Sequence, residues 1–266
     1  MPILTLLTDF GTDDEYVGLM KGVILSINPR VAIVDITHRI GRQNVAQAAF
    51  TIHASYRYFP AGSVHLVVVD PGVGTGRALL ALETRNHFFI APDNGSLTLL
   101  IDEADVTSLI RITNADFFLN PVSRTFHGRD IIAPVGAHLT KGVELSKLGP
   151  EMDPLNTVRL DNLQARMLKN GKIIGKIIAI DHFGNLISNV DRRQLARYDQ
   201  TDLSDKLKIE IGSRVIHGLS KTYGDVRSNT PLALIGSRGY LEIAANTGNA
   251  AQILKAHIGD AVRVTI

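Results

Sequence analysis

The sequence predicts two domains of different class: an N-terminal Rossmann-like α/β domain with a mostly parallel sheet, then a small antiparallel β-barrel. Over the first 70 residues, strand-like and helix-like segments alternate. After about residue 168, strand-like segments follow one another with turn residues between them and few helices. Between the two patterns lies KLGPEMDPLNTVRL, which has two prolines and no clear period. We therefore expect an N-terminal domain at 1–155, a linker at 156–169 and a C-terminal domain at 170–266.

The first five segments alternate strand, helix, strand, helix, strand, which is typical of a parallel sheet covered by helices. In the first helix, Thr12 and Glu15 have the spacing of a capping box, and Asn28-Pro29 marks the end. The second helix ends at Pro60. In chain order the segments are ILTLLTD, TDDEYVGLMKGVILSINP, VAIVDITH, NVAQAAFTIHASYRYFP and HLVVVD.

The later segments are shorter and less regular. In the N-terminal domain we expect strands at 77–84, 87–92 and 107–113, a short helix at 95–104, and a helical pattern at 129–142. In the C-terminal domain we expect strands within 171–190, 206–216, 231–245 and 260–266, and short helices at 191–198 and 249–256.

Composition excludes several classes of protein. Of 266 residues, 45% are hydrophobic and 20% charged, which is typical of a soluble globular chain. The net charge of +2 gives no support to nucleic-acid binding. The chain has no cysteine, so a disulfide framework, a thiol nucleophile and a zinc-thiolate site are excluded. No leader sequence and no apolar run of roughly 20 residues stand out, so we expect a cytoplasmic protein without a membrane partner.

The loop VVVDPGVGTGR, residues 67–77, has three glycines after a strand, as many phosphate-binding loops do. A dinucleotide fingerprint needs G-x-G-x-x-G leading into a helix, whose N-terminus binds the pyrophosphate. Here the spacing is G-x-G-x-G, and the following RALLALET alternates as a strand does. The segment also lacks the lysine of a P-loop. The loop is therefore interpreted as a holder of Asp70 and Arg77 or as a plain turn.

Two carboxylates end neighbouring strands of the expected sheet. Asp9 ends the first strand and Asp70 the third, and ligands of open α/β sheets bind beyond the carboxyl ends of the strands. We expect both to face one crevice. Asp13 and Asp14 follow on the expected first turn of a helix, where acidic residues also complement the helix dipole.

Polar turns supply further candidates. His127 lies in RTFHGRD between two arginines, and a single histidine of this kind is either functional or merely structural. In the C-terminal half, DHFGNLISN and GSRGYLE are glycine-containing turns with polar and aromatic side chains.

Taken together, six ordered segments carry a family resemblance. They are LLTDFGTDDEYVGLMKG, VVVDPGVGTGR, IAPDNGSLT, TFHGRD, AIDHFGNLISN and GSRGYLEIAANTGNAA. The sequence strongly resembles the S-adenosyl-L-methionine (SAM) hydroxide adenosyltransferases, or SAM hydrolases, which are related to fluorinases and chlorinases. The resemblance covers nearly the whole chain. It implies a homotrimer in which SAM lies between the N-terminal domain of one subunit and the C-terminal domain of its neighbour.

The resemblance also assigns roles by motif position. It implies a catalytic triad of Asp70, Arg77 and His127 near the attacking water. The residues implied in substrate binding are Asp9 for the ribose hydroxyls, Asp13 and Asp181 around the methionine amino group, Ser237 and Arg238 at the methionine carboxylate, Phe183 and Asn185 along the adenosine, and Glu242 from the GSRGYLE segment. Asp181 is carried over less securely, because DHFGN is one residue shorter than in fluorinases.

Departures from the halogenating relatives point to hydrolysis. The resemblance places a tyrosine at Asp70, a threonine at Val73 and a serine at Gly128 in fluorinases, which also have an inserted loop that is absent here. Val73 has no hydroxyl with which to hold a halide. The expected reaction is attack of water or hydroxide on the ribose C5′ of SAM, giving adenosine and L-methionine.

That chemistry needs neither a metal nor a cofactor, because the sulfonium leaves as a neutral thioether. Adenosine is expected to co-purify. Two alternatives stay open at this point: a metal-dependent phosphohydrolase that uses Asp9, Asp13 and Asp70, and a protein that binds SAM or adenosine without catalysis.

Overall fold

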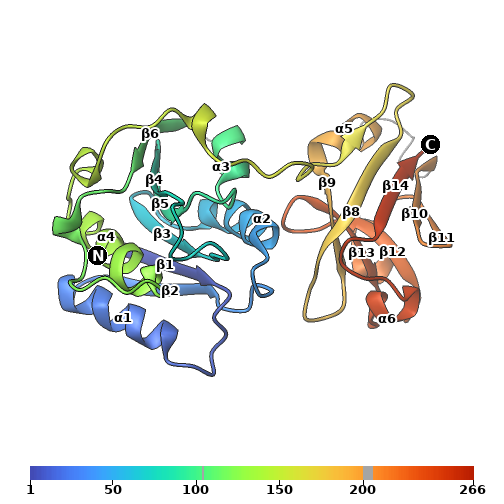
Figure 1. The fold of residues 1–266 in the computed structure, drawn as a ribbon. Helices are drawn as coiled ribbons and strands as arrows, with labels where there is room; N and C mark the ends of the chain where they lie inside the picture. The colour runs from blue at the N-terminus through green and yellow to red at the C-terminus, as the bar shows by residue number, and fades with distance from the viewer. Residues whose placement is uncertain (104, 200–205) are drawn as a thin grey trace. The chain divides into compact units, whose positions relative to one another are not determined.

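The computed structural model describes residues 1–103, 105–199 and 206–266, and it divides into two compact units. The first unit is Met1–Leu160 and the second is Asp161–Ile266 (Figure 1). The division lies within 156–169, the range that the sequence assigns to a linker. Each unit has its own hydrophobic core.

The first unit is built on a six-stranded sheet with the order β2-β1-β3-β5-β4-β6. Strands β2, β1, β3 and β5 are parallel, whereas β4 runs antiparallel to both of its neighbours. This confirms the mostly parallel sheet. The strands are β1 Ile3–Thr8, β2 Ala32–Thr37, β3 Ser63–Val68, β4 Leu79–Thr84, β5 His87–Pro92 and β6 Val106–Arg111.

Helices cover both faces of this sheet (Figure 1). Leu4 and Leu6 of β1 belong to a core shared with the two helices α1 Tyr16–Ile27 and α4 Ala133–Leu139. Leu7 belongs to a second core, shared with α2 Val45–Ser55 and α3 Thr98–Glu103. Strands buried on both faces consist of nearly continuous apolar residues, as ILTLLT does. The last residue of the helix expected at 95–104 lies outside the described residues.

The start of the first helix differs from the prediction. Helix α1 begins at Tyr16, its N-cap is Glu15, and no side chain caps it, so the capping box of Thr12 and Glu15 is wrong. Asp13 and Asp14 therefore precede the helix and do not lie in its first turn. The reason lies upstream: Gly11, with a φ of 72°, donates its N–H to the carbonyl of His38. The chain is thus held at the carboxyl ends of β1 and β2 before the helix begins.

The helical pattern expected at 129–142 is interrupted by a wider turn. Residues Gly128–Ile132 form a π-helical turn, and α4 continues from Ala133. Pro134 has no N–H to give to the carbonyl of Asp130, which accepts a hydrogen bond from Leu119 N at 2.8 Å instead. A proline near the start of α4 is thus accommodated by the wider turn that precedes it.

The second unit is an antiparallel, barrel-like sheet with the order β11-β10-β14-β8-β9-β13-β12, and β7 pairs with β8. The end strands β11 and β12 contact each other, so the sheet is nearly closed, which confirms the predicted barrel. The strands are β7 Arg166–Met167, β8 Ile173–Ile180, β9 Leu186–Asp191, β10 Lys208–Ile211, β11 Arg214–His217, β12 Pro231–Ile235, β13 Tyr240–Ala245 and β14 Ala261–Thr265, with the short helices α5 Arg192–Asp199 and α6 Ala250–Leu254.

Within the described ranges, no helix is both long enough and apolar enough to cross a membrane.

Candidate active site

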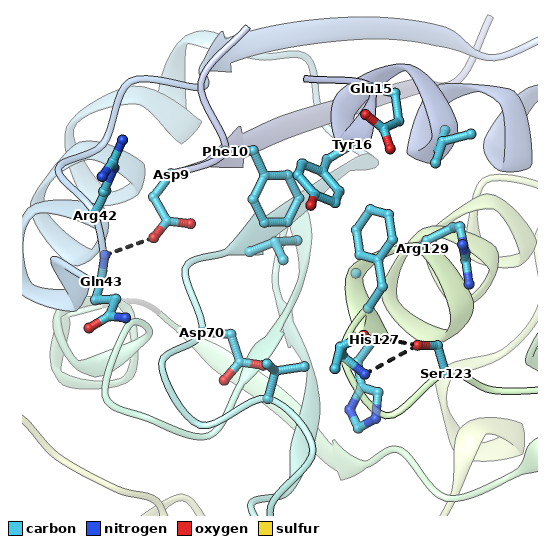
Figure 2. Close-up of a pocket in the computed structure, with 16 residues that line it drawn as sticks. Asp9, Phe10, Glu15, Tyr16, Arg42, Gln43, Asp70, Ser123, His127 and Arg129 are labelled. Atoms are coloured by element: carbon cyan, nitrogen blue, oxygen red, sulfur yellow. Dashed lines mark hydrogen bonds between the residues drawn. The ribbon is translucent and has the colours of Figure 1, made fainter. Parts of the chain in front are cut away.

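The first unit has a pocket of about 560 Å³ at the carboxyl ends of β1 and β3. These strands are neighbours, with Thr8 opposite Val68. Asp9 follows β1 and Asp70 follows β3, and both line the pocket (Figure 2). The two carboxylates therefore converge on one crevice, as the positions of their strands predict.

The glycine loop runs from Asp70 into β4 without an intervening helix. Its middle residue, Gly74, has a φ of 78°, and an added Cβ would lie 2.4 Å from the carbonyl oxygen of Arg124. Only glycine fits this close approach without displacing the backbone of one segment or the other. The loop is thereby packed against the segment that leads to His127.

Asp70, Arg77 and His127 form a connected chain of hydrogen bonds. Arg77 Nε donates to both Asp70 oxygens at 2.7 Å, and Arg77 Nη2 also donates to Asp70 Oδ2. The same Nη2 donates to Nδ1 of His127 at 3.1 Å. The side chains of Arg77 and Asp70 are only 9% and 7% exposed, so this ion pair is largely screened from water. Asp70 and His127 line the pocket, and Arg77 is hydrogen-bonded to both of them.

This geometry fixes the neutral form of His127. A guanidinium has donors and no acceptor, so Nδ1 of His127 must accept and the ring proton of the neutral imidazole lies on Nε2. Burial lowers the pKa of His127, and the positive charge of Arg77 lowers it further, while Asp70 and Asp130 act in the opposite direction. His127 is therefore neutral at neutral pH, with Nε2–H as a hydrogen-bond donor.

Asp9 is held by the backbone at the start of the second helix. Its Oδ2 accepts a hydrogen bond from Gln43 N at 2.8 Å (Figure 2). The preceding residue, Thr8, is bonded to buried His38 through Oγ1 and Nδ1 at 2.9 Å, and Thr8 Oγ1 also accepts from Phe10 N. These contacts set the direction of the chain at Asp9.

An aromatic cluster lines the same pocket and was missed by sequence reasoning. The rings of Phe10, Tyr16 and Phe126 lie 5.2–5.7 Å apart, with both Phe10 and Tyr16 meeting Phe126 edge to face. Arg129 lies over the ring of Phe126 at 5.2 Å. Tyr16 and Phe126 are 110 positions apart, so no local pattern joins them. The sequence indicated these residues only in that Phe10 and Tyr16 lie in the motif LLTDFGTDDEYVGLMKG and Phe126 lies in the motif TFHGRD.

Asp13 is not among the residues that line this pocket. It is exposed in the turn before α1, and Glu15 lines the pocket instead.

The other expected substrate-binding residues gather on the second unit, in a pocket of about 870 Å³. Its lining includes Asp181, Phe183 and Asn185 from the β8–β9 turn, Ser237 and Arg238 from the β12–β13 turn, and Glu242 from β13. Strand β13 pairs with both β9 and β12, which explains why the two turns meet. Tyr223 also lines this pocket and donates a hydrogen bond to Glu242, and no sequence motif indicated it.

Among the residues that the structure describes, no group of three or more His, Asp or Glu side chains is placed to hold a metal ion. Asp70 is engaged by Arg77.

Fold and pockets together define a two-domain protein with a parallel-sheet ligand site and a second pocket on a β-barrel. The chain matches the SAM hydroxide adenosyltransferase N-terminal domain over residues 4–149 and the C-terminal domain of the same family over residues 175–263. This chain belongs to the SAM hydroxide adenosyltransferase family.

Curated relatives resemble it over their full length. An (R)-S-adenosyl-L-methionine hydrolase of Salinispora tropica is 36% identical, with 99% of this chain and 98% of the relative covered. One of the same name from Thermus thermophilus is 35% identical, with 97% of each covered. A fluorinase of Actinopolyspora mzabensis is 29% identical, over 99% of this chain and 97% of the relative. A crystal structure of a conserved protein from Thermotoga maritima has a TM-score of 0.92 at 36% identity, covering 99% of this chain and all of that chain.

Proposed function

We propose that the protein hydrolyses SAM to adenosine and L-methionine. The observation that carries the proposal is the Asp70–Arg77–His127 chain at the pocket on the carboxyl ends of β1 and β3. Curated relatives at 33–36% identity over almost the whole chain are named (R)-S-adenosyl-L-methionine hydrolases, which supports the same substrate here.

In the reaction, a bond forms between a water oxygen and C5′ of the ribose, and the C5′–S bond breaks. The sulfur keeps the bonding electrons and leaves as the neutral thioether of methionine, so no general acid is needed. One water proton goes to solvent. What the protein must supply is an ionised or well-oriented water in line with the C–S bond.

Arg77 is suited to favour the ionised form of that water, because a nearby positive charge stabilises hydroxide. Its guanidinium is held in place by Asp70, and the Nε2–H of His127 would donate a hydrogen bond to the water. Asp9 would bind both ribose hydroxyls and so fix C5′ for attack. The rings of Phe10, Tyr16 and Phe126 line the same pocket, and a ring face there would stabilise the sulfonium cation of the substrate.

The test is incubation of the purified protein with SAM, with and without EDTA, followed by chromatography of the products. The expected result is equal formation of adenosine and methionine in both arms. Recovery of intact SAM would identify a binding protein, and loss of activity with EDTA would identify metal-dependent chemistry. Adenosine released on denaturing the purified protein would show that the product stays bound through purification.

Variants of the triad test the assignment of roles. Asp70→Ala, Arg77→Ala and His127→Ala should each lower turnover by about 10²–10³-fold, the effect of losing one preorganised group at a transition state, and leave SAM binding largely intact. The control is Arg85→Ala, an exposed arginine in the β4–β5 turn that should keep full activity. Turnover at the wild-type rate in all three variants contradicts the triad.

We further propose a homotrimer whose sites lie at subunit interfaces, in the cytoplasm. The support is that the triad and Asp9 lie on one unit, whereas Asn185, Arg238 and the rest of the substrate-binding set lie on the other. Light scattering should give three times the mass of one chain. A co-expressed mixture of His127→Ala and Asn185→Ala chains should be more active than either variant alone, because some interfaces then combine two intact pockets. A trimer of mixed chains without this gain contradicts a shared site, and cell fractionation tests the location.

A further inference from the structure

His38 directly follows β2, and the proposed reaction does not use it. Its side chain is only 5% exposed. The ring is bonded through Nδ1 to Thr8 Oγ1 at 2.9 Å, and the backbone carbonyl accepts from Gly11 N at 2.8 Å. His38 therefore holds both ends of the segment from Thr8 to Gly11. That segment carries two residues of the first pocket, Asp9 and Phe10.

The hydrogen bonds around the His38 ring run in one direction. Nε2 lies 3.1 Å from Asp35 Oδ1, although without the alignment of a hydrogen bond. Burial acts to raise the pKa of Asp35, but its contacts with Lys21 and His38 lower the pKa by more, so this carboxyl is ionised at neutral pH. A carboxylate favours the ring proton on Nε2, which leaves Nδ1 of the neutral ring to accept from the hydroxyl of Thr8. Thr8 Oγ1 in turn accepts from Phe10 N at 3.2 Å.

The pairing of β2 with β1 is irregular just before His38. Leu6 of β1 pairs with Asp35, but the next residue of β1 pairs with Thr37, so β2 has one extra residue at this point. Bulges of this kind change the direction of nearby side chains and are common beside active sites. Regular pairing is thus interrupted immediately before the residue that bonds to Thr8.

A second irregularity lies on the other side of Asp9. Gln43 has a φ of 60°, in the left-handed region that residues with a side chain adopt rarely. Its N–H donates to Asp9 Oδ2 at 2.8 Å, and among the described residues no hydrogen bond reaches Oδ1. Strained backbone of this type clusters at functional sites. One oxygen of Asp9 is therefore held, and the other is left for a ligand.

Strand β1 carries a second threonine–histidine pair, which serves as a comparison. Thr5 Oγ1 is bonded to His65 Nδ1 at 2.8 Å, and both residues are fully buried. Neither of them lines the first pocket. A buried bond of this type on β1 is thus not in itself linked to the pocket. The bond of Thr8 is linked to it, because Asp9 comes next in the chain.

We propose that His38, acting through Thr8, is a positioning residue that orients Asp9 for recognition of the ribose hydroxyls of SAM. A carboxylate that binds two neighbouring hydroxyls needs a fixed orientation, because both hydrogen bonds weaken when its plane turns. The bonds from His38 to the two ends of the segment supply that orientation on one side, and the N–H of Gln43 supplies it on the other. This assignment rests on the proposed function and deepens it.

The experiment measures kcat/KM for SAM and for its 2′,3′-dideoxy analogue, which lacks both ribose hydroxyls. Wild-type protein should prefer SAM by about 10²–10⁴-fold, the worth of two hydrogen bonds to a charged group. Thr8→Val removes the hydroxyl, and His38→Gln removes the acceptor at the position of Nδ1. Each should reduce the preference by about tenfold or more, because Asp9 loses its orientation. Thr8→Ser keeps the hydroxyl and His38→Asn keeps an acceptor near the position of Nδ1, so both should retain most of the preference.

Thr5→Val is the matched control, because it removes an equally buried bond to a histidine from the same strand. It should lower Tm about as much as Thr8→Val does and leave the preference unchanged. Circular dichroism would confirm that each variant is folded, and the comparison of His38→Gln with His38→Asn stands if Thr8→Val does not fold. A preference that survives in folded Thr8→Val and His38→Gln overturns the assignment. An equal loss of preference in Thr5→Val overturns it as well, as does a preference that survives in Asp9→Ala.

The outcomes distinguish this assignment from the proposed function. If wild-type protein releases no adenosine from SAM, the proposed function fails. Calorimetric titration with adenosine and with 2′,3′-dideoxyadenosine then still measures the preference for the ribose hydroxyls, and the same variants test His38. If adenosine is released but the preference is the same in every variant, only the role of His38 fails.

Discussion

Replacing Gly74 by alanine tests whether the glycine loop holds Arg77 and His127 in register. Gly74 combines a φ of 78° with a would-be Cβ only 2.4 Å from the Arg124 carbonyl oxygen. A left-handed backbone costs an L-residue about 1–2 kcal/mol, and overpacking costs about 1–3 kcal/mol more. We therefore expect a loss of about 2–5 kcal/mol, with a fall of about 2–4 °C in Tm for each kcal/mol.

The carbonyl of Arg124 cannot retreat alone, because its segment is tied down on both sides. Ser123 N donates to Asp130 Oδ2 at 2.7 Å, and the N–H of Asp130 donates to the carbonyl of Phe126 at 3.1 Å. The loop that carries Arg77 should therefore give way. A displacement of about 1 Å in a catalytic constellation can cost about 10²-fold, so kcat/KM should fall by that order.

Two glycines of the same unit serve as matched controls. Gly76→Ala meets no atom within 4 Å and has no positive φ, so it should leave both Tm and activity unchanged. Gly62→Ala has a φ of 83° and open space, so it reports the backbone cost alone. Calorimetry and adenosine release are the two assays. If Gly74→Ala behaves as Gly76→Ala does in both, the loop does not position the triad.

Four further outcomes are expected. Burial, with a smaller effect of His87, lowers the pKa of His65 from 6.5 to about 3, so the unfolded chain binds a proton that the folded chain excludes. Stability that is complete above pH 6.5 should therefore fall by about 1.4 kcal/mol per pH unit toward pH 3, seen as a lower urea midpoint. Nitrogen-15 NMR should find His127 neutral and protonated on Nε2 at pH 7. Because the pKa of His127 is lowered from 6.5, any loss of activity that its protonation causes should occur below pH 6.5. Chloride or fluoride should yield no halogenated adenosine by mass spectrometry, and Gly128→Ser should lower Tm, because its Cβ would lie 3.0 Å from Val68 Cγ1.

His65→Gln should flatten the pH dependence of stability, whereas exposed His217→Gln should not, and equal slopes in all three proteins contradict the assignment to His65. A proton on Nδ1 of neutral His127 contradicts the bond from Arg77, and Arg77→Ala should release the ring to both tautomers. Detection of 5′-chloro- or 5′-fluoro-5′-deoxyadenosine contradicts the exclusion of halide chemistry.

The fold was predictable where local pattern and tertiary packing agree. Continuous apolar runs such as ILTLLT signal strands that are buried on both faces, and β1 and β3 are such strands. The start of α1 was not predictable, because Gly11 bonds to the carbonyl of His38, a partner 27 positions away that the capping pattern does not contain. The π-turn before α4 likewise depends on Leu119, outside the helical segment.

The two strand-end carboxylates were predictable from topology, since Asp9 and Asp70 follow adjacent parallel strands. Tyr223 was not, because it meets Glu242 only through the folding of β12 and β13, 19 positions later. The aromatic cluster at the first pocket has the same origin: Phe126 reaches Tyr16 because α1 packs on the helix that follows His127. Side chains that are so far apart in the sequence do not form a local motif, so their contact cannot be predicted from residue spacing.

The hydrogen bonds of Arg77 also indicate how this site would promote the proposed reaction. Both oxygens of Asp70 accept from the guanidinium, and Nδ1 of His127 accepts from it as well, so Arg77 binds both of its partners at once. In the proposed reaction, neither partner is then free to take the water proton through the atoms that face Arg77. The site is better suited to stabilise hydroxide by charge and orientation than to remove a proton. A lysine could supply the charge but not the planar fork that holds Asp70 and His127 together, which is why an arginine at this position makes chemical sense.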